Sequence, residues 1–351
     1  MFDNKLYLED IENIIQSIDD WNFIKNKSVF ISGASGMIGS LIVDVLMDVN
    51  YKFNCNCTII ANGRNEELMK SKFERYLNDA NFKLYIQDIN NPLNIDEDIN
   101  FIIHAASNTH PMAYSQDPIG TITTNIIGTN NLLNCAVNKK TEKIIFLSSV
   151  EIYGENKGDI DKFEENYLGY INCNTLRAGY PESKRAGEAL CQAYIEKYNM
   201  NISIARLARI YGPTMLLSDT KAVSQFIKKA INNEDIVLKS DGSQQYSYLY
   251  VADAVSGILK ILKDGKNGEA YNLGDSESDI TLRQLAQLVA NTKNRKVIFD
   301  LPSEEEKKGY STATKAMLNC RKINTELGWK AKYNIKSGIE RTISILEKQN
   351  L

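Results

Sequence analysis

The sequence predicts an α/β fold: a doubly wound parallel sheet of the Rossmann type that carries a smaller, interleaved α/β substrate-binding lobe. Short apolar strands alternate with helices from residue 28 to residue 206, and a glycine-rich turn joins the first of these strands to its helix. Strands that are apolar along their whole length are typical of parallel sheets covered by helices on both faces. Such a sheet binds its ligands at the carboxyl ends of its strands, so we expect the functional residues there.

The chain divides into three expected regions. Residues 1–27 predict an N-terminal helical leader that packs on the body or on a partner subunit, because apolar side chains recur there at helical spacing. Residues 28–206 predict the dinucleotide-binding domain, to which later pieces near 248–275 return. Residues 207–351 predict mainly the substrate-binding lobe, in which Thr281 is the expected N-cap of a helix.

The predicted elements follow from the apolar pattern. The strands of the sheet are expected at 29–31, 58–61, 84–87, 101–104 and 143–148. The helices are expected at 37–47, 66–78, 125–137, 223–231, 251–262 and 281–290.

Composition and charge exclude several classes of partner. The formal net charge of -3 gives no basic footprint for nucleic acid or for an anionic membrane. The first ten residues do not resemble a signal peptide, and the longest apolar stretch, at 38–49, is too short and too often interrupted by polar residues to span a bilayer. Two histidines and six scattered cysteines do not form a metal-ligand pattern. We therefore expect a cytoplasmic protein without a metal ion.

The glycine-rich turn predicts a dinucleotide site. Gly33 permits a tight turn, Gly36 lets the backbone approach a pyrophosphate closely, and Gly39 allows the helix to pack against the strand. The free N–H groups and positive dipole end of the helix then face the phosphates. The intervening residues that share this expected cofactor site are Ser35, Met37 and Ile38.

The end of the second strand bears on the choice of cofactor. An NAD site usually places an acidic residue there to bind the ribose hydroxyls, but residues 60–64 include none. Arg64 is suited to a 2′-phosphate, so NADP(H) is favoured over NAD(H); the alternative is a solvated surface arginine. Asp88, followed by Ile89, is placed to bind the adenine amine or merely to cap a turn.

A tyrosine and a lysine at helical spacing predict acid–base chemistry. Tyr180 and Lys184 lie one turn apart, so they share a helix face. The lysine ammonium is expected to lower the pKa of the phenol, which then exchanges a proton with a substrate hydroxyl or carbonyl. Ser149 ends the fifth strand and is expected to bind the same substrate oxygen. Nearby Glu151 is expected to transfer a second proton or merely to bind a substrate hydroxyl.

Ordered motifs give the chain a resemblance to a known family. They are Gly33-x-x-Gly36-x-x-Gly39, His104-Ala105-Ala106-Ser107, Thr124-Asn125-x-x-Gly128-Thr129, Ser148-Ser149-x-x-x-Tyr153-Gly154, Tyr180-x-x-x-Lys184, Tyr211-Gly212-Pro213, Tyr250-Val251-Ala252-Asp253 and Ala270-Tyr271-Asn272-Leu273-Gly274. With them the chain resembles the extended short-chain dehydrogenase/reductase family of nucleotide-sugar epimerases, dehydratases and decarboxylases. The resemblance implies a catalytic Ser149, Tyr180 and Lys184, and a homodimer formed by the helices at 120–137 and 180–194. It also implies cofactor contacts from Ala105, Ala106, Ser107, Asn125 and Asp88.

Departures from the family pattern narrow the reaction. Sugar 4,6-dehydratases carry Asp-Glu where this chain has Val150-Glu151, which argues against elimination of water. UDP-glucuronate decarboxylases resemble the chain here but use an arginine where Tyr246 stands. Arg209 replaces a usual substrate-binding asparagine, and we expect it to supply the missing charge; the alternative is an ordinary strand arginine. Thr109, Arg209 and Tyr246 are the expected substrate contacts.

The combined expectation is an NAD(P)-dependent enzyme that acts on a nucleotide-linked sugar or polyol. A short stretch, 239–253, resembles a subgroup that reduces CDP-linked keto-sugars with NADPH, which makes that reduction the first prediction. The alternatives are an NAD-dependent nucleotide-sugar 4-epimerase or a UDP-glucuronate decarboxylase-like enzyme. A different class of function, a non-catalytic NADP-binding redox sensor, fits less well because such proteins commonly lose the tyrosine or the lysine.

Overall fold

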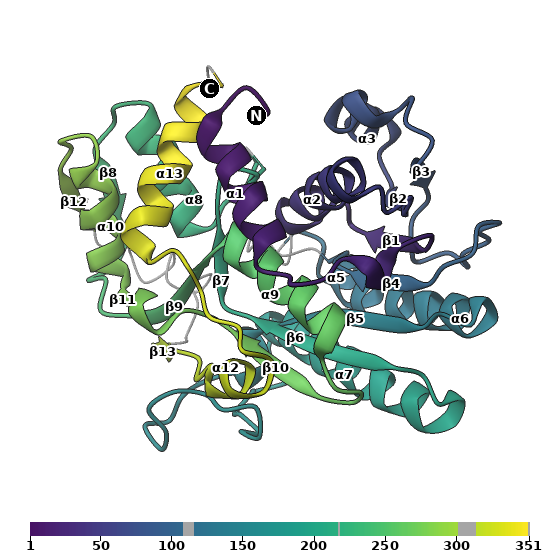
Figure 1. Cartoon of the computed structure of the whole chain (residues 1–351). Coiled ribbons are helices and arrows are strands. Elements are labelled where there is room, and N and C mark those ends of the chain that lie inside the picture. The colour runs from purple at the N-terminus through teal and green to yellow at the C-terminus, as the bar shows by residue number, and fades with distance from the viewer. Residues whose placement is uncertain (108–115, 217, 301–313, 350–351) are drawn as a thin grey trace.

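A seven-stranded parallel sheet forms the centre of the molecule (Figure 1). The computed structural model describes residues 1–107, 116–216, 218–300 and 314–349. The strand order is β10-β6-β5-β4-β1-β2-β3, so the direction of winding reverses at β1. Its strands are β1 (Ser28–Ser32), β2 (Thr58–Gly63), β3 (Phe82–Ile86), β4 (Phe101–His104), β5 (Lys143–Ser149), β6 (Ile202–Leu207) and β10 (Ala270–Leu273). The predicted doubly wound α/β fold is confirmed.

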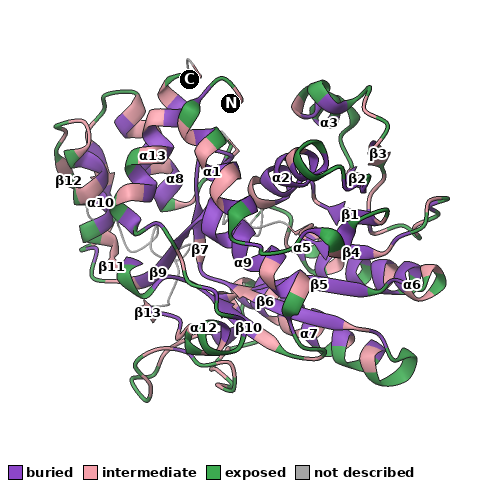
Figure 2. Cartoon of the chain, viewed as in Figure 1, coloured by how far each residue is buried: buried purple, intermediate pink, exposed green. Residues whose placement is uncertain are grey.

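Helices cover both faces of this sheet, which explains why its strands are apolar throughout. In β1, Val29 and Ile31 join one hydrophobic cluster with α2 and α9, whereas Phe30 joins a second cluster with α6 and α7 on the opposite face. The central strands are accordingly buried along their length (Figure 2). The helices around the sheet are α2 (Met37–Phe53), α3 (Glu66–Lys72), α5 (Pro118–Thr123), α6 (Thr129–Lys139), α7 (Gly179–Tyr198), α9 (Val251–Asp264) and α12 (Arg321–Leu327).

A smaller lobe lies beside the carboxyl ends of the strands (Figure 1). In it, β9 (Gln245–Tyr250) pairs with β7 (Arg209–Tyr211), β11 (Asp279–Thr281) and β13 (Lys315–Ala316). A separate pair joins β8 (Ile236–Leu238) to β12 (Val297–Phe299). The lobe's helices are α8 (Ala222–Ile231), α10 (Leu282–Asn291) and α13 (Ile335–Glu347). Thr281 caps α10 in a capping box with Gln284, as predicted.

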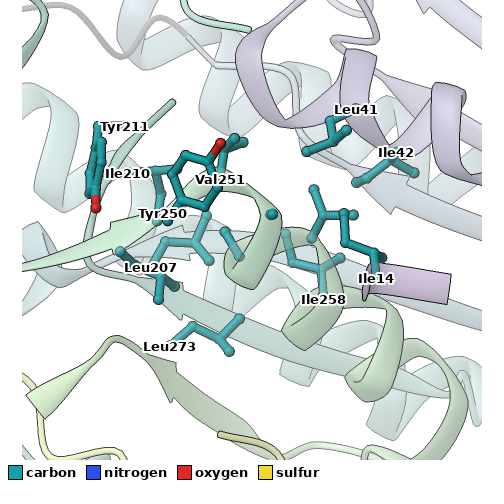
Figure 3. Close-up of a cluster of buried hydrophobic side chains, with 14 of the residues drawn as sticks. Ile14, Leu41, Ile42, Leu207, Ile210, Tyr211, Tyr250, Val251, Ile258 and Leu273 are labelled. Carbon is teal, nitrogen blue, oxygen red and sulfur yellow. The ribbon is translucent and has the colours of Figure 1, made fainter. Parts of the chain in front are cut away.

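The lobe and the sheet interleave through α9. Within the stretch at 248–275, α9 packs on the sheet and β10 pairs with β6, whereas β9 belongs to the smaller sheet. Side chains from α1, α2, β6, β7, α9 and β10 gather in one buried cluster (Figure 3). This shared core holds the lobe against the sheet without a linker. Within the described ranges, no helix combines the length and apolar character needed to cross a bilayer.

The N-terminal leader is shorter than the predicted one, but it packs on the body as expected. Helix α1 spans Lys5–Gln16 and contacts α2, α9 and α13. Apolar residues continue after the helix ends. One of them, Trp21, is buried because its indole folds back and donates to the Ile15 carbonyl at 3.1 Å. Buried Asp10 accepts a 2.6 Å hydrogen bond from Tyr250 and pairs with Arg341, which ties α1 to the end of β9 and to α13.

Two other helices depart from their predicted form. The helix expected at 66–78 ends at Lys72 and is followed by a 3₁₀ turn at Glu74–Tyr76, where the Tyr76 ring packs on Phe82. The helix expected at 125–137 starts with a π-helical turn, Thr124–Gly128, that connects α5 to α6. Such turns frequently occur at functional sites. Apolar spacing alone predicts neither irregularity.

Candidate active site

The glycine turn between β1 and α2 requires glycine for a different reason at each position. Gly33 has a φ of +68°, and a Cβ there would lie 2.7 Å from the Ala106 Cα. At Gly39 a Cβ would lie 2.5 Å from the Gly33 carbonyl oxygen, so α2 packs directly on the turn. At Gly36, the N-cap of α2, a Cβ would meet this same oxygen at 3.2 Å and otherwise enter open space. Gly36 therefore leaves its side of the turn open to a ligand.

A cleft of about 570 Å³ extends from this turn along the carboxyl ends of the strands. It lies at β1 and β4, where the strand order reverses and where doubly wound sheets bind ligands. The expected cofactor residues that line it are Gly33, Ser35, Gly36, Met37, Ile38, Gly39, Arg64, Asp88, Ile89, Ala105, Ala106, Ser107, Tyr180 and Lys184. The open first turn of α2 and the absence of any Cβ at Gly36 fit a pyrophosphate.

At one end of the cleft, β2 places an amide and a guanidinium where many relatives of this fold place an acid. The Asn62 side chain donates to the carbonyls of Tyr85 and Gln87, at 3.0 and 2.9 Å, and so fastens β2 to the chain after β3. Arg64 is exposed and lines the cleft. Asp88 also lines it, and its Oδ1 accepts from the Asn90 N–H at 2.9 Å, so it caps a turn as well.

A buried histidine supports the segment after β4 that lies against the glycine turn. Ser32 Oγ accepts the N–H groups of Ala105 and Ala106, so its own proton goes to His104 Nδ1, at 2.7 Å. Thr129 donates to the Asn125 carbonyl and accepts from His104 Nε2 at 2.9 Å. Burial lowers the pKa of His104 to about 3, so the imidazole is neutral and protonated on Nε2.

The three expected catalytic residues meet in the middle of the cleft. Ser149 ends β5, and Tyr180 and Lys184 lie one turn apart near the start of α7, with both side chains buried. Burial raises the pKa of Tyr180, while hydrogen bonding to the Ser149 and Ser107 side chains lowers it. The two serines thus favour the phenolate that a proton transfer from the phenol would leave.

Lys184 packs against β5 in the structure. Its Nζ donates to the Leu147 carbonyl at 2.8 Å and lies 5.0 Å from the centre of the Phe146 ring, both in β5. The hydrogen bonds that lower the Tyr180 pKa come from the serines rather than from this ammonium. Burial lowers the pKa of Lys184 to about 8. The spacing along α7 could not show this, because it depends on how α7 packs on β5.

Asn125 lies behind the cleft rather than in its lining. Its side chain is buried in the π-helical turn, accepts from Ser107 Oγ at 2.8 Å, and donates to Ser183 Oγ at 2.9 Å. Ser183 in turn donates to the Tyr180 carbonyl at 2.9 Å. Asn125 therefore connects a hydrogen-bonding partner of the Tyr180 hydroxyl to the backbone of the same tyrosine.

Charged residues gather where the cleft reaches the lobe. Glu151 lies 3.4 Å from Arg177 and 3.8 Å from Arg209, and the Arg209 guanidinium lies 3.6 Å above the centre of the Tyr246 ring. Tyr246 is thus buried beneath Arg209 instead of lining the cleft. The expected contact Thr109 lies outside the described residues.

The sequence analysis missed three charged residues at this end of the cleft. Arg177, Asp219 and Lys221 all line it. Arg177 lies on the 3₁₀ turn three residues before Tyr180, so its spacing from the tyrosine was a usable signal. Asp219 and Lys221 follow β7 in a loop, where no periodic pattern indicates which way a side chain points.

Comparison with a family model decides the affiliation of the chain. The model of the NAD dependent epimerase/dehydratase family matches residues 29–274. The chain belongs to this family. The extended short-chain dehydrogenase/reductase resemblance and the expectation of an enzyme are thereby confirmed.

Curated relatives in this family are similar over most of their length. UDP-glucuronic acid decarboxylase 3 of Arabidopsis thaliana is 31% identical over 322 residues, which cover 90% of this chain and 87% of the relative. UDP-glucuronic acid decarboxylase 1 of Danio rerio is 30% identical over 327 residues, which cover 92% of this chain and 73% of the relative.

Solved structures of family members share the fold. UDP-glucose 4-epimerase from Thermotoga maritima, solved with UDP-glucose, gives a TM-score of 0.78 at 22% identity and covers 92% of this chain and 100% of its own. UDP-glucuronic acid 4-epimerase from Bacillus cereus, solved with UDP-glucuronic acid and NAD, gives a TM-score of 0.77 at 22% identity with the same coverage.

A matched pair of glycine variants tests whether Gly39 serves packing and Gly36 serves ligand binding. We expect Gly39→Ala to lower the free energy of unfolding by about 1–3 kcal/mol, because the new methyl group would overlap the backbone of Gly33 and Ala34. Gly36→Ala should leave urea denaturation nearly unchanged but weaken nicotinamide dinucleotide binding at least tenfold in a fluorescence titration. Equal dinucleotide affinity in Gly36→Ala and the unmodified protein would contradict this account of the turn.

Proposed function

We propose that this chain oxidises or reduces one carbon of a nucleotide-linked sugar, with Tyr180 exchanging the proton of the reacting hydroxyl. The observation that carries the proposal is the meeting of Ser149, Tyr180 and Lys184 in the cleft that begins at the glycine turn. A nicotinamide dinucleotide bound along the cleft supplies the hydride acceptor or donor. The residues of the chain bind and orient the sugar and move its proton.

Each catalytic side chain has a distinct part in this proposal. Tyr180 takes the proton of the sugar hydroxyl during oxidation and returns it during reduction. Ser149 holds the same sugar oxygen and stabilises the phenolate, as its hydrogen bond to the tyrosine supports. Lys184, with its ammonium buried at the end of β5, binds the ribose next to the nicotinamide.

We propose a UDP-linked sugar of the glucuronic acid type as the substrate. Similarity to UDP-glucuronic acid decarboxylases over most of the chain supports this choice. Oxidation of the hydroxyl β to a sugar carboxylate gives a β-keto acid, which loses CO₂ readily. Glu151, between Arg177 and Arg209, accepts hydrogen bonds from the sugar in this proposal.

A second candidate is the reduction of a nucleotide-linked keto-sugar, CDP-linked in the sequence prediction, with NADPH. Arg64 in the cleft favours it, since residues 62–65 bring no carboxylate to that end and a guanidinium suits a 2′-phosphate. Structures of similar fold were solved with NAD. We therefore propose NADP(H) as the cofactor only for this second candidate. Net consumption of NADPH distinguishes a reductase from an enzyme that regenerates its cofactor.

Turnover of a substrate panel tests the proposed function. The protein is incubated with UDP-glucuronic acid and with CDP-, UDP- and dTDP-sugars, each with NAD or NADPH, and products are identified by mass spectrometry. Tyr180→Phe should lower kcat by about 10²–10⁴-fold with dinucleotide binding retained, because the phenol is the acid and base. Tyr198→Phe, an exposed tyrosine on the same helix, is the control. Turnover that survives in Tyr180→Phe would contradict the role of Tyr180, and dinucleotide binding without turnover of any substrate would favour the non-catalytic redox sensor.

Arg209 is the proposed replacement for the arginine that decarboxylases carry at position 246. Strands β7 and β9 are neighbours, so a guanidinium from β7 reaches the face of the Tyr246 ring. Arg209→Ala should raise the KM for the nucleotide sugar at least tenfold, since a lost charge-assisted contact costs about 1.5–3 kcal/mol. Arg185→Ala, on the surface of α7 beside Glu182, is the matched control. An unchanged KM in Arg209→Ala would remove Arg209 from the substrate site.

We propose a homodimer formed through α5 and α7. Ile119, on α5, is 74% exposed, and Ile127 in the π-helical turn is 45% exposed. Ala186, Ala189 and Ala193 share one accessible face of α7, where small side chains allow a second copy to pack closely. Sedimentation equilibrium should give twice the chain mass, and Ile119→Glu should give monomers. A monomer in the unmodified protein at micromolar concentration would contradict the proposal.

A further inference from the structure

A buried carboxylate stands behind the proposed catalytic lysine, one turn further along α7. Glu188 accepts from the Ser148 hydroxyl at 2.5 Å, and its two oxygens receive the Arg206 guanidinium at 3.1 and 2.7 Å. Glu188 and Arg206 are only 11% and 13% exposed. A bidentate pair of this kind fixes both the position and the charge of the carboxylate.

The arginine of this pair is itself held by three residues. Besides Glu188, Arg206 donates to the Tyr153 hydroxyl at 2.9 Å and to the Glu165 carbonyl at 2.7 Å. It lies in β6, directly beside Ser148 of β5 in the sheet register. The carboxylate is therefore bound to both β5 and β6, the two strands that support α7. It cannot rotate away from them into solvent.

Glu188 supplies the opposite charge that Lys184 faces within the described part of the chain. The titratable groups that act on the ammonium are Glu188 and Cys191 of α7 and His104 of β4, and the charged Arg206 of β6 is the partner of Glu188. His104 and Cys191 are neutral, since burial lowers the pKa of the imidazole to about 3 and raises that of the thiol. From β5, Lys184 meets only the Leu147 carbonyl and the Phe146 ring.

We propose that Glu188 is a positioning residue whose fixed carboxylate keeps the Lys184 ammonium charged in its buried place. The inference rests on the proposed function in one respect: there, the charged Lys184 binds the ribose beside the nicotinamide. Burial alone disfavours a lysine cation, and a carboxylate one helical turn away opposes that effect. Arg206 and Ser148 act through Glu188 by preventing it from turning away.

The pH dependence follows from the sign of each effect. A lysine loses its charge as the pH rises through its pKa, which burial has brought to about 8 in Lys184 and which Glu188 holds up. Removing the carboxylate therefore lowers this pKa further. The alkaline limb of the activity profile then moves to lower pH, while a merely structural role for Glu188 leaves its position unchanged.

The test is a ¹³C NMR titration of lysine Cε in the full-length protein, with the Lys184 signal assigned by its loss in Lys184→Arg. We expect Glu188→Gln, which keeps the shape of the side chain, to lower the Lys184 midpoint by about one pH unit or more. Glu188→Asp, which keeps the negative charge, should lower the midpoint less than Glu188→Gln does. Glu196→Gln, an exposed acid further along α7, is the matched control and should leave the midpoint in place.

A double variant guards against loss of the fold. Breaking a buried ion pair at one partner typically costs about 3–5 kcal/mol, whereas replacing both partners costs far less. Glu188→Gln with Arg206→Met should therefore fold and lower the midpoint in the same direction, but by less than the single variant, because the opposing Arg206 cation is removed as well. An unchanged Lys184 midpoint in either folded variant would overturn the inference. A shifted midpoint in a protein that turns over no nucleotide sugar would support the inference and contradict the proposed function.

Discussion

The close contact of backbones at the carboxyl edge of the sheet is the constraint on which the site depends. The turn after β1 comes so near the segment after β4 that no Cβ fits between Gly33 and Ala106. Parallel strands all end at this edge, so the ends of β1, β4 and β5 and the start of α7 converge there. A dinucleotide cleft and the catalytic side chains share one edge because the strands run in one direction.

Each polar group buried at this edge needs a hydrogen-bonding partner. These hydrogen bonds fix the positions of the site residues. His104 is satisfied by Ser32 and Thr129, and Asn125 is satisfied by Ser107 and Ser183. These hydrogen bonds connect β1, β4, the π-helical turn and α7. Because an unpaired buried polar group costs about 1–3 kcal/mol, the network also holds Tyr180 and Lys184 in place.

The sequence predicted the features that depend on neighbouring residues. The turn from Gly33 to Gly39 and the helical spacing of Tyr180 and Lys184 are local patterns, and the structure places these residues in one cleft. The structure also confirms Thr281 as a cap. Each of these features needs only the residues within one or two turns of the chain.

Features that depend on packing between distant segments could not be predicted in this way. The ammonium of Lys184 points to β5, and Arg209 covers Tyr246 because β7 lies beside β9. Asn125 was expected to contact the cofactor. The π-helical turn instead directs its amide behind the cleft, where it bonds to Ser183. Helix α1 ended early although its apolar spacing continued, since Trp21 reaches the same core from an irregular segment.

The central claim is that Tyr180 faces the reactive ring of a dinucleotide bound in this cleft. The most direct measurement is a nuclear Overhauser effect between the nicotinamide ring protons of added cofactor and selectively labelled tyrosine rings. The resonances of Tyr180 are identified by their loss in Tyr180→Phe. The account predicts cross-peaks from the nicotinamide to Tyr180. Cofactor binding with cross-peaks only to other tyrosines, or with none, would contradict it.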